Sequence, residues 1–342
     1  MSNDLPLVCI CIPTYNAAAS IRETLESILA QTYPNLTIHV SDNASIDDTL
    51  KIVESISDRR ISLHRHDVNV GGEGNFNRCI QFAEGKYTAI FHADDIYEPD
   101  MVTRQVAFLE AHAGAGAVFT EAILIDEAGN SIGEIRLPKD ISSPNGLYEF
   151  STMFKAVLRH SNFFICPSFM VCTQIYKQEI KIWQGELFGS GADLDVWLRI
   201  LQNHPIGHLP ERLMRYRISN KQFSARVRLE TERAIIFKII DYYLEQHGVR
   251  GMLNSGDFLN YKSLGRRDRL GRAVNLFLID RPMEARELLN ATLSWDALRA
   301  SCQSASGFLV LLGNVYLRSL IAMRLYRIGK KSLGYIKQLT NR

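Results

Sequence analysis

The stretch LVCICIPTYN, residues 7–16, joins an unbroken apolar run to a cluster of polar residues. Leu7 to Ile12 contains no charged side chain, and Pro13 ends the run. A continuous apolar run is typical of a strand that is buried on both faces, as in a parallel sheet covered by helices. The stretch therefore predicts a central strand that carries polar residues at its carboxyl end.

Helix and strand patterns alternate after this first strand. Apolar residues recur at helical spacing at positions 21, 25, 28 and 29, and short runs of strand formers follow. The predicted helices cover residues 19–30, 47–56, 74–83 and 99–112, and the predicted strands cover residues 37–40, 61–64, 87–92 and 117–124. Strands separated by helices predict βαβ units, and therefore an α/β fold with a mostly parallel, helix-covered sheet.

Polar clusters stand at the ends of three predicted strands: TYN (14–16), SDNAS (41–45) and HADD (92–95). In a parallel sheet, ligands bind beyond the carboxyl ends of the strands. We therefore expect the three clusters to converge on one crevice. The polar residues at the ends of the first two strands would hold a nucleoside there.

The rest of the chain changes in character. Residues 126–145 are polar and turn-rich, which predicts irregular structure with a hairpin, and apolar content resumes at 147–158 and 163–172. A helix begins near Ala192, and beyond about residue 228 the pattern is almost wholly helical. We expect an α/β domain over residues 1–227 and a helical C-terminal region over residues 228–342.

The glycine-rich segment GGEG, residues 71–74, superficially resembles a loop that binds phosphate. It lacks the G-x-x-x-x-G-K-S/T pattern of such loops, so we predict only a loop ahead of a helix.

Charge is distributed unevenly along the 342 residues, although the net charge is only +2. No acidic residue follows Asp296, whereas eight of the 39 Lys and Arg residues do. The first 296 residues contain 31 basic and 37 acidic residues, a net charge of −6. We expect a basic C-terminal segment on an acidic body, and no nucleic-acid partner.

The six cysteines, at positions 9, 11, 79, 166, 172 and 302, form no CxxC pair and no metal-ligand spacing. Cys9 and Cys11 lie in an apolar strand, so reduced thiols and a cytoplasmic protein are the simple interpretation. The first residues, MSNDLPLVCICIP, lack the basic and apolar regions of a signal peptide.

Asp94 and Asp95 follow directly after a predicted strand. Adjacent carboxylates suit Mg²⁺ or Mn²⁺, which are held by one or two carboxylates together with substrate phosphates. A metal ion there would stabilise a departing diphosphate. The alternative is an acidic turn that begins a helix, since anions favour helix N-termini.

Further segments carry a resemblance to a known family. CIPTYNAAASIRETLESILAQTYPNLTIHVSDNASIDDT, NVGGEGNFNRCIQFAEGKY and FHADDIYEPDMV resemble, in order and spacing, the nucleotide-sugar domain of family-2 glycosyltransferases over about residues 6–110. SGADLDVWLRI and RLMRYRIS extend the likeness to about residue 220. The resemblance implies a GT-A fold, an inverting transferase of bacterial polysaccharide biosynthesis, a nucleotide-sugar donor, and Mn²⁺ or Mg²⁺ as cofactor.

The resemblance assigns the first two clusters to the nucleotide. Pro13, Thr14 and Tyr15 would line the base pocket, with Asn16 in the same cluster. Asp42 would accept a hydrogen bond from the imide N–H of the base.

The family's D-x-D motif maps onto His92, Ala93 and Asp94, with Asp95 next to it. Asp94 would bind the metal ion, and the other three residues would contact the nucleotide sugar. The first aspartate of the motif is replaced by His92, which removes one negative charge. An imidazole can still contact ribose or bind Mn²⁺, but it can equally be a hydrogen-bonded histidine with no ligand.

Asn77 falls where the family has an Arg-Asn pair, which makes it a further candidate contact for the nucleotide sugar. The residue in the place of the arginine is Phe76.

Asp193 maps onto the family's catalytic base, in an E-D motif whose glutamate is replaced by Ala192. It would take the proton from the acceptor hydroxyl as that oxygen attacks the anomeric carbon. The alternative for Asp193, and for the nearby Asp195, is a first-turn aspartate that only stabilises the helix dipole.

Arg217 lies in the YRIS segment, where Ser219 replaces a frequent family histidine. Arg217 would contact phosphate, or else pair with an acidic neighbour.

The C-terminal region suggests further partners. Gly307 to Ile328 is apolar but is interrupted by Asn314, Arg318 and Arg324, so a membrane span is not expected. An apolar helix beside basic residues suits the inner face of an anionic membrane, where the acceptor would be a lipid-linked saccharide. Packing on the catalytic domain, or a homodimer contact, is the competing interpretation.

Two other functions fit parts of this pattern. One is a sugar-phosphate nucleotidyltransferase, which would require a basic phosphate-binding loop after the first strand. The segment at that place, TYNAAAS, has no basic residue. The other is a non-catalytic nucleotide-sugar-binding protein, which the departures at His92, Ala192 and Ser219 would allow.

Overall fold

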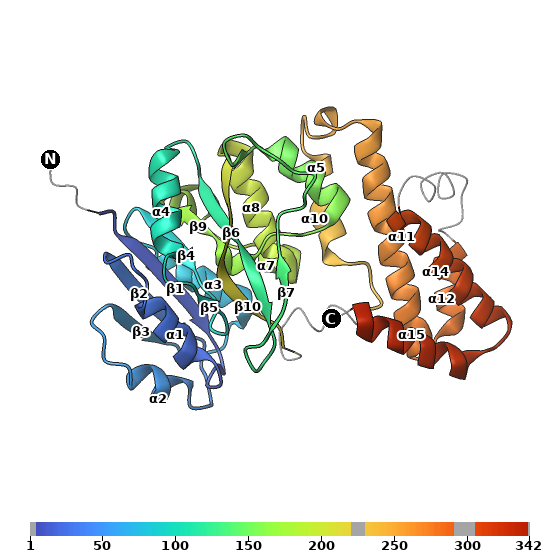
Figure 1. Ribbon diagram of the computed structural model, residues 1–342, viewed down its shortest axis with the longest axis horizontal. Coiled ribbons are helices and arrows are strands. Elements are labelled where there is room, and N and C mark those ends of the chain that lie inside the picture. The colour runs from blue at the N-terminus through green and yellow to red at the C-terminus, as the bar shows by residue number, and fades with distance from the viewer. Residues whose placement is uncertain (1–4, 220–229, 291–304, 341–342) are drawn as a thin grey trace. The chain divides into compact units, whose positions relative to one another are not determined.

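The computed structural model describes residues 5–219, 230–290 and 305–340 (Figure 1). The chain divides into two compact units. The first contains Met1–Phe154 and Asn162–Ser219, and the second contains Lys155–Ser161 and Asn220–Arg342. The domain boundary expected at 227/228 falls within residues 220–229, outside the described residues.

One half of the sheet in the first unit is parallel. Its strands lie in the order β3–β2–β1–β4, with β1 at Val8–Thr14, β2 at Leu36–Asp42, β3 at Ile61–Arg65 and β4 at Tyr87–Ile90. These are the strands that the alternating pattern predicts. The βαβ interpretation is therefore confirmed for this half.

The other half of the sheet is mixed. The short strand β9 (Met170–Cys172) runs antiparallel between β4 and β6 (Ala117–Ile125), and β10 (Ile206–Arg217) pairs parallel with β6. Three further strands pair antiparallel at its margins: β5 (Ile96–Tyr97) and β8 (Leu147–Tyr148) with β10, and β7 (Ser131–Ile135) with β6. The β6–β7 pair is the hairpin expected within residues 126–145.

Helices cover the sheet as expected (Figure 1). The longer ones are α1 (Ile21–Leu29), α2 (Thr49–Glu54), α3 (Gly71–Phe82), α4 (Met101–Ala111), α5 (Phe150–His160) and α8 (Ala192–Asn203). The shorter ones are α6 (Thr173–Ile175), a π-helix at Tyr176–Ile180, α7 (Gly185–Phe188) and 3-10 turns at Cys166–Ser168 and Gly189–Gly191. The α/β fold with a helix-covered sheet is confirmed.

The prediction of a loop at GGEG was wrong, because these residues form the first turn of α3. Gly71 begins the helix with φ +79°, a backbone conformation that glycine adopts without steric cost.

Strand β1 is buried on both faces, as its composition predicts. Val8 and Ile10 pack in the main core with Leu25 of α1. On the opposite face, the Cys11 thiol donates a hydrogen bond to the Cys79 carbonyl of α3 at 3.4 Å. The strand therefore fixes a helix on each side of the sheet.

The second unit is helical in its described residues. It contains α10 (Ile235–Glu245), a 3-10 turn at Arg250–Met252, α11 (Ser255–Leu278), α12 (Pro282–Asn290), α14 (Ala305–Ala322) and α15 (Tyr326–Thr340). Asn254 and Asp257 form a capping box that begins α11. Buried apolar residues of α11, α12, α14 and α15 share one core.

Substitution of Gly85, between α3 and β4, tests how much the stability of the first unit depends on close backbone packing. It has φ +66°, and a Cβ atom there would lie 2.5 Å from the Leu7 carbonyl oxygen. We predict that Gly85→Ala lowers the free energy of unfolding by about 2–4 kcal/mol, from the left-handed conformation and the clash together. Urea denaturation measures this change.

Gly129→Ala is the matched control, since Gly129 has φ +85° but no atom within 4 Å of the added Cβ. The free energy of unfolding of Gly129→Ala should fall by only about 1–2 kcal/mol, from the left-handed conformation alone. Equal losses in the two variants would contradict the role of the Leu7 contact.

Candidate functional site

The loops after β1 and β2 are joined by hydrogen bonds at the ends of these strands. The Asn16 side-chain oxygen accepts from Ile46 N at 2.9 Å, and Asn16 N donates to the Ser45 hydroxyl at 2.9 Å. Asn43 N donates to the Thr14 carbonyl at 2.8 Å. The two clusters thus form one surface, and the polar atoms of Asn16 hold its shape.

The Asp42 carboxylate is buried within this surface. Its Oδ2 accepts from Ser45 N at 2.9 Å, whereas its Oδ1 has no hydrogen-bond partner among the described residues. A buried, unpaired carboxylate oxygen is costly unless a ligand supplies a donor. The geometry suits the predicted bond from a base N–H.

The other residues of the predicted base pocket differ in exposure. Tyr15 is 48% exposed, so its ring is available for stacking. Pro13 is half-buried, and Thr14 is buried with its hydroxyl donating to the Ile12 carbonyl at 3.2 Å. Thr14 is therefore less available than Pro13 and Tyr15 for contact with a base.

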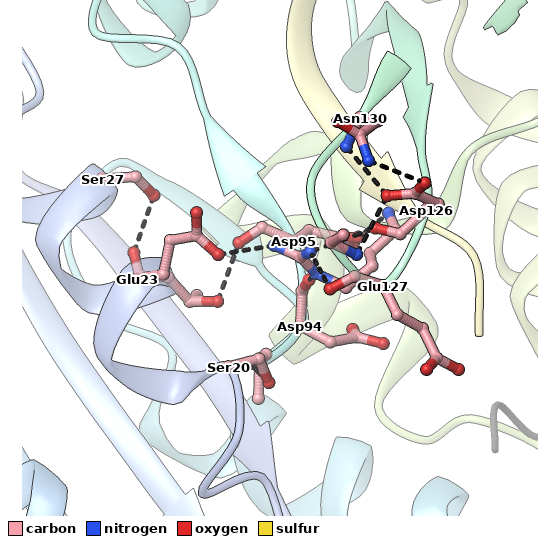
Figure 2. Close-up of polar contacts among 12 residues, drawn as sticks. Ser20, Glu23, Ser27, Asp94, Asp95, Asp126, Glu127 and Asn130 are labelled. Atoms are coloured by element: carbon pink, nitrogen blue, oxygen red, sulfur yellow. Dashed lines mark hydrogen bonds and ion pairs between the residues drawn. The ribbon is translucent and has the colours of Figure 1, made fainter. Parts of the chain in front are cut away.

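The HADD cluster follows β4. The metal-ligating atoms of His92, Asp94 and Asp95 all lie within 4.8 Å of one another, and this is the only such group found in the described part of the chain. Ala93 is buried between them, and its carbonyl accepts from the Ser20 hydroxyl at 2.9 Å. Figure 2 shows the Asp94 carboxylate extending away from the contacts around Asp95.

Asp95 is fully buried, and its two oxygens differ. Oδ1 accepts from Arg217 N at 2.8 Å, while Oδ2 has no hydrogen-bond partner within the described residues. The nearest ring nitrogen, His92 Nδ1, lies 3.8 Å from Oδ2, beyond hydrogen-bond range. Two atoms that bind one metal ion at about 2.1 Å each can have this separation.

The residues around this cluster shift its ionisation. Burial, reinforced by the charge of Asp94, raises the pKa of Asp95 well above its usual range. Burial lowers the pKa of His92, against the opposing effect of Asp94. A neutral imidazole beside carboxylates can act as a metal ligand, so this donor set fits a divalent cation.

Arg217 contacts the protein itself. Its guanidinium binds Glu23 at 2.6 Å, the Asp94 carbonyl at 2.9 Å, and the carbonyls of Asp126 and Glu127 at 3.2 Å each. These contacts surround Asp95 (Figure 2). The structure therefore shows pairing with an acidic neighbour, which is one of the two alternatives for Arg217, and the contact with phosphate stays a prediction.

Asp193 stands in the first turn of α8, partly buried. Its Oδ1 accepts from Leu194 N at 2.7 Å, and the Asn162 amide lies 3.5 Å from Oδ2. Burial raises the pKa of this carboxyl to about 6, although the bond from Leu194 N opposes the shift.

Asp195, by contrast, is fully buried and pairs with Arg199 at 2.9 Å. Arg199 also donates to the carbonyls of Ile180 and Ile182. The pair holds the segment before α7, which gives Asp195 a structural role.

Asn77 also binds backbone. Its amide exchanges two hydrogen bonds with Trp183, donating to the carbonyl at 3.2 Å and accepting from N at 2.6 Å. Asn77 therefore positions Trp183, and its contact with the nucleotide sugar stays a prediction. The Trp183 ring stacks on Phe76 at 4.4 Å, and the Phe76 ring meets the edge of His92 at 5.7 Å.

The charges of several of these acidic groups act on two residues to which the sequence analysis gave no role. Burial, then the charges of Asp95, Asp94 and Asp193, raise the pKa of Tyr216 above its usual range. Burial, then Asp193 and Asp95, likewise raise the pKa of Cys166. Asp193 therefore lies within electrostatic reach of the HADD cluster. The sequence offered no signal for either residue, because the strand that contains Tyr216 was not predicted.

Comparisons with known proteins agree with this geometry. The profile described as "Glycosyl transferase family 2" matches residues 9–180, about half of the chain. An uncharacterized glycosyltransferase of Methanocaldococcus jannaschii is 30% identical over 223 residues, which is 64% of this chain and 73% of that protein.

The Escherichia coli protein named UDP-Glc:alpha-D-GlcNAc-diphosphoundecaprenol beta-1,3-glucosyltransferase WfaP is 36% identical over 106 residues. This match covers 31% of this chain and 42% of WfaP.

Among solved structures, S. aureus TarS 1–349 in complex with UDP-GlcNAc is similar, with a TM-score of 0.63 at 18% identity. The match covers 95% of this chain and 91% of that chain, and it supports a GT-A fold. Together with the family profile and the relatives, it sets aside the nucleotidyltransferase and the non-catalytic binder. The chain belongs to glycosyl transferase family 2, and it is a glycosyltransferase.

Proposed function

We propose that this chain transfers a sugar from a nucleoside-diphosphate donor to a saccharide, or to a lipid-linked saccharide, by a single displacement with inversion. The transfer depends on Mn²⁺ or Mg²⁺. One observation carries the proposal: the buried Oδ2 of Asp95, which has no hydrogen-bond partner in the described residues, lies beside His92 and Asp94 directly after β4.

The nucleoside binds at the ends of β1 and β2. The unpaired Oδ1 of Asp42 accepts the imide N–H of the base, and the exposed ring of Tyr15 stacks on it. Pro13 and the backbone near Asn16 shape the pocket wall. The complex of TarS with UDP-GlcNAc, a protein of similar fold, supports a nucleotide-sugar donor.

Asp94 and His92 bind the metal ion, and Asp95 faces the same site. A divalent cation there supplies positive charge that stabilises the departing diphosphate. Replacement of a carboxylate by the His92 imidazole favours Mn²⁺ over Mg²⁺, because nitrogen ligands suit transition metals better.

Asp193 accepts the proton of the acceptor hydroxyl. Its position is fixed by the Leu194 N–H and by Asn162. A pKa of about 6 lets the carboxylate stay ionised at neutral pH while it becomes a stronger base than an exposed aspartate.

The acceptor class rests on fewer observations. WfaP, by its name, acts on a saccharide linked to diphosphoundecaprenol, and this supports a lipid-linked saccharide for the present chain. No helix in the described residues is long and apolar enough to cross a membrane. Peripheral contact with the inner face of a membrane, and a homodimer, remain predictions.

Asp193→Asn should lose transfer by about 10²–10⁴-fold, because asparagine keeps the size of aspartate but cannot accept a proton. The loss should appear in kcat, with donor and metal affinity unchanged. In the wild type, kcat should fall about tenfold per pH unit below about pH 6, as the carboxylate becomes protonated. Initial rates across pH, with melting temperature on the same preparations, measure both effects.

Asp48→Asn is the control, since Asp48 is exposed and pairs only locally with Lys51. It should transfer at the wild-type rate. An Asp193→Asn enzyme that also transfers at that rate, with stability lower by about 0.3–1 kcal/mol, would show a helix-dipole role instead.

Asp94→Asn should abolish metal-dependent turnover of the donor, by roughly 100-fold or more, while the protein stays folded. Titration of Mn²⁺ in the presence of nucleoside diphosphate measures the weakened binding directly. Unchanged Mn²⁺ affinity and turnover in a folded variant would refute the metal role of Asp94.

Asp42→Ala should raise the Kd of the nucleoside diphosphate roughly 10- to 100-fold, since a charged acceptor for the base is lost. The effect should be the same with and without Mn²⁺, in contrast to Asp94→Asn. Calorimetric titration under both conditions tests this, and equal affinity in variant and wild type would reject the assignment.

A further inference from the structure

Helix α14 of the second unit is apolar on two opposite faces. On one face, Leu317, Leu320 and Ile321 are buried, in a core shared with α11, α12 and α15. This face accounts for the folding of the unit. The opposite face has no such role.

Six apolar side chains on the opposite side of α14, or just after its end, are between 39% and 65% exposed: Phe308, Leu309, Leu312, Val315, Tyr316 and Met323. At 3.6 residues per turn they fall within an arc roughly 120° wide. Such a stripe is the pattern of a helix face that packs on an apolar surface.

The exposed apolar surface continues onto α15. Ile328 is 60% exposed and Tyr335 is 64% exposed, at positions i and i+7 of one helix face. The Tyr316 hydroxyl lies 2.8 Å from the Ser332 hydroxyl, which joins the two helices on this side. We call the six α14 residues together with Ile328 and Tyr335 the open face. Isolated exposed apolar residues are normal, but a contiguous set of eight marks an interaction site.

Positive charge accompanies the open face. Arg324, Arg327 and Lys331 are exposed in the turn between α14 and α15 and on α15. Ile328, Lys331, Ser332, Gly334 and Tyr335 line a shallow groove there. No acidic residue follows Asp296 in the sequence.

We propose that the open face binds the surface of an anionic membrane. Apolar side chains enter the boundary between headgroups and acyl chains, and the basic residues contact acidic headgroups. Anionic lipid is favoured over a second copy of the chain, because a symmetric pair would bring the same positive charges together. The helices lie on the membrane, consistent with the lack of a spanning helix in the described residues.

This inference goes beyond the proposed function and does not depend on it. It concerns the second unit, whereas donor binding and catalysis are assigned to the first unit. A lipid-linked acceptor would give the membrane contact an obvious purpose.

Co-sedimentation of the full chain with vesicles tests the inference, using phosphatidylcholine with and without phosphatidylglycerol. The wild type should bind the anionic vesicles at least about tenfold more tightly, and added salt should weaken binding. The double variant Leu312→Glu/Val315→Glu should bind the anionic vesicles at least about tenfold more weakly than the wild type. Lys331→Gln should weaken it about fivefold, on anionic vesicles alone.

Ile279→Glu/Met283→Glu is the matched control, because these residues are 54% and 62% exposed in the same unit but lie outside the open face. It should bind vesicles like the wild type, and circular dichroism should show that all the variants fold. Failure of the wild type to bind anionic vesicles would overturn the proposal.

Sedimentation velocity tests whether the open face instead binds a second copy of the chain. If the Leu312→Glu/Val315→Glu variant dissociates a dimer but still binds vesicles, the open face is a dimer contact, and the membrane proposal is wrong. Donor hydrolysis should be normal in every variant, so a failure of the proposed function would be seen separately.

Discussion

The buried carboxylate of Asp95 connects the two halves of the sheet. It belongs to the loop after β4, and it accepts a hydrogen bond from the backbone of Arg217 at the end of β10, 122 residues later. The Arg217 side chain then returns to the Asp94 carbonyl and to Glu23 of α1. Leaving the buried donor or acceptor of the Asp95–Arg217 backbone bond without its partner typically costs about 1–3 kcal/mol. The position of Asp94, and so of any bound metal ion, depends on this network.

This network explains why the HADD cluster is held rigidly although some of its polar atoms lack hydrogen-bond partners in the described residues. Backbone and guanidinium groups occupy Oδ1 of Asp95 and the Asp94 carbonyl, whereas Oδ2 of Asp95 and Nε2 of His92 have no hydrogen-bond partner in the described residues. A protein bears the cost of buried, unpaired polar atoms mainly where a ligand satisfies them. These two atoms are therefore the groups that the proposed metal site would satisfy.

The sequence predicted the parallel half of the sheet well, because each of its strands is a short apolar run between helical stripes. It did not reveal β10, whose second half, RLMRYR, has Arg212, Arg215 and Arg217 among its apolar residues. It also did not reveal β9, since a strand of three residues is too short for a periodic pattern. Both strands are stabilised by neighbours distant in the sequence.

The candidate site shows the same limit. The acidic pair and Asp42 were recognisable because polar residues directly follow apolar strands. The protein partners of Arg217 and Asn77 could not be identified from the sequence, since they lie between 90 and 194 residues away in the chain. Which polar side chains remain for a ligand is decided by long-range contacts, and no local motif records them.

The anchoring of Trp183 has a consequence for how such a site can change. Asn77 binds only the backbone N–H and carbonyl of residue 183, so the anchor does not require a tryptophan side chain. A different side chain could stand at this position, against Phe76 and near His92, while the chain path stays fixed. Because Trp183 is only 4% exposed, such a change would repack the ring cluster and lower stability, while the bonds from Asn77 would still fix the path of the backbone.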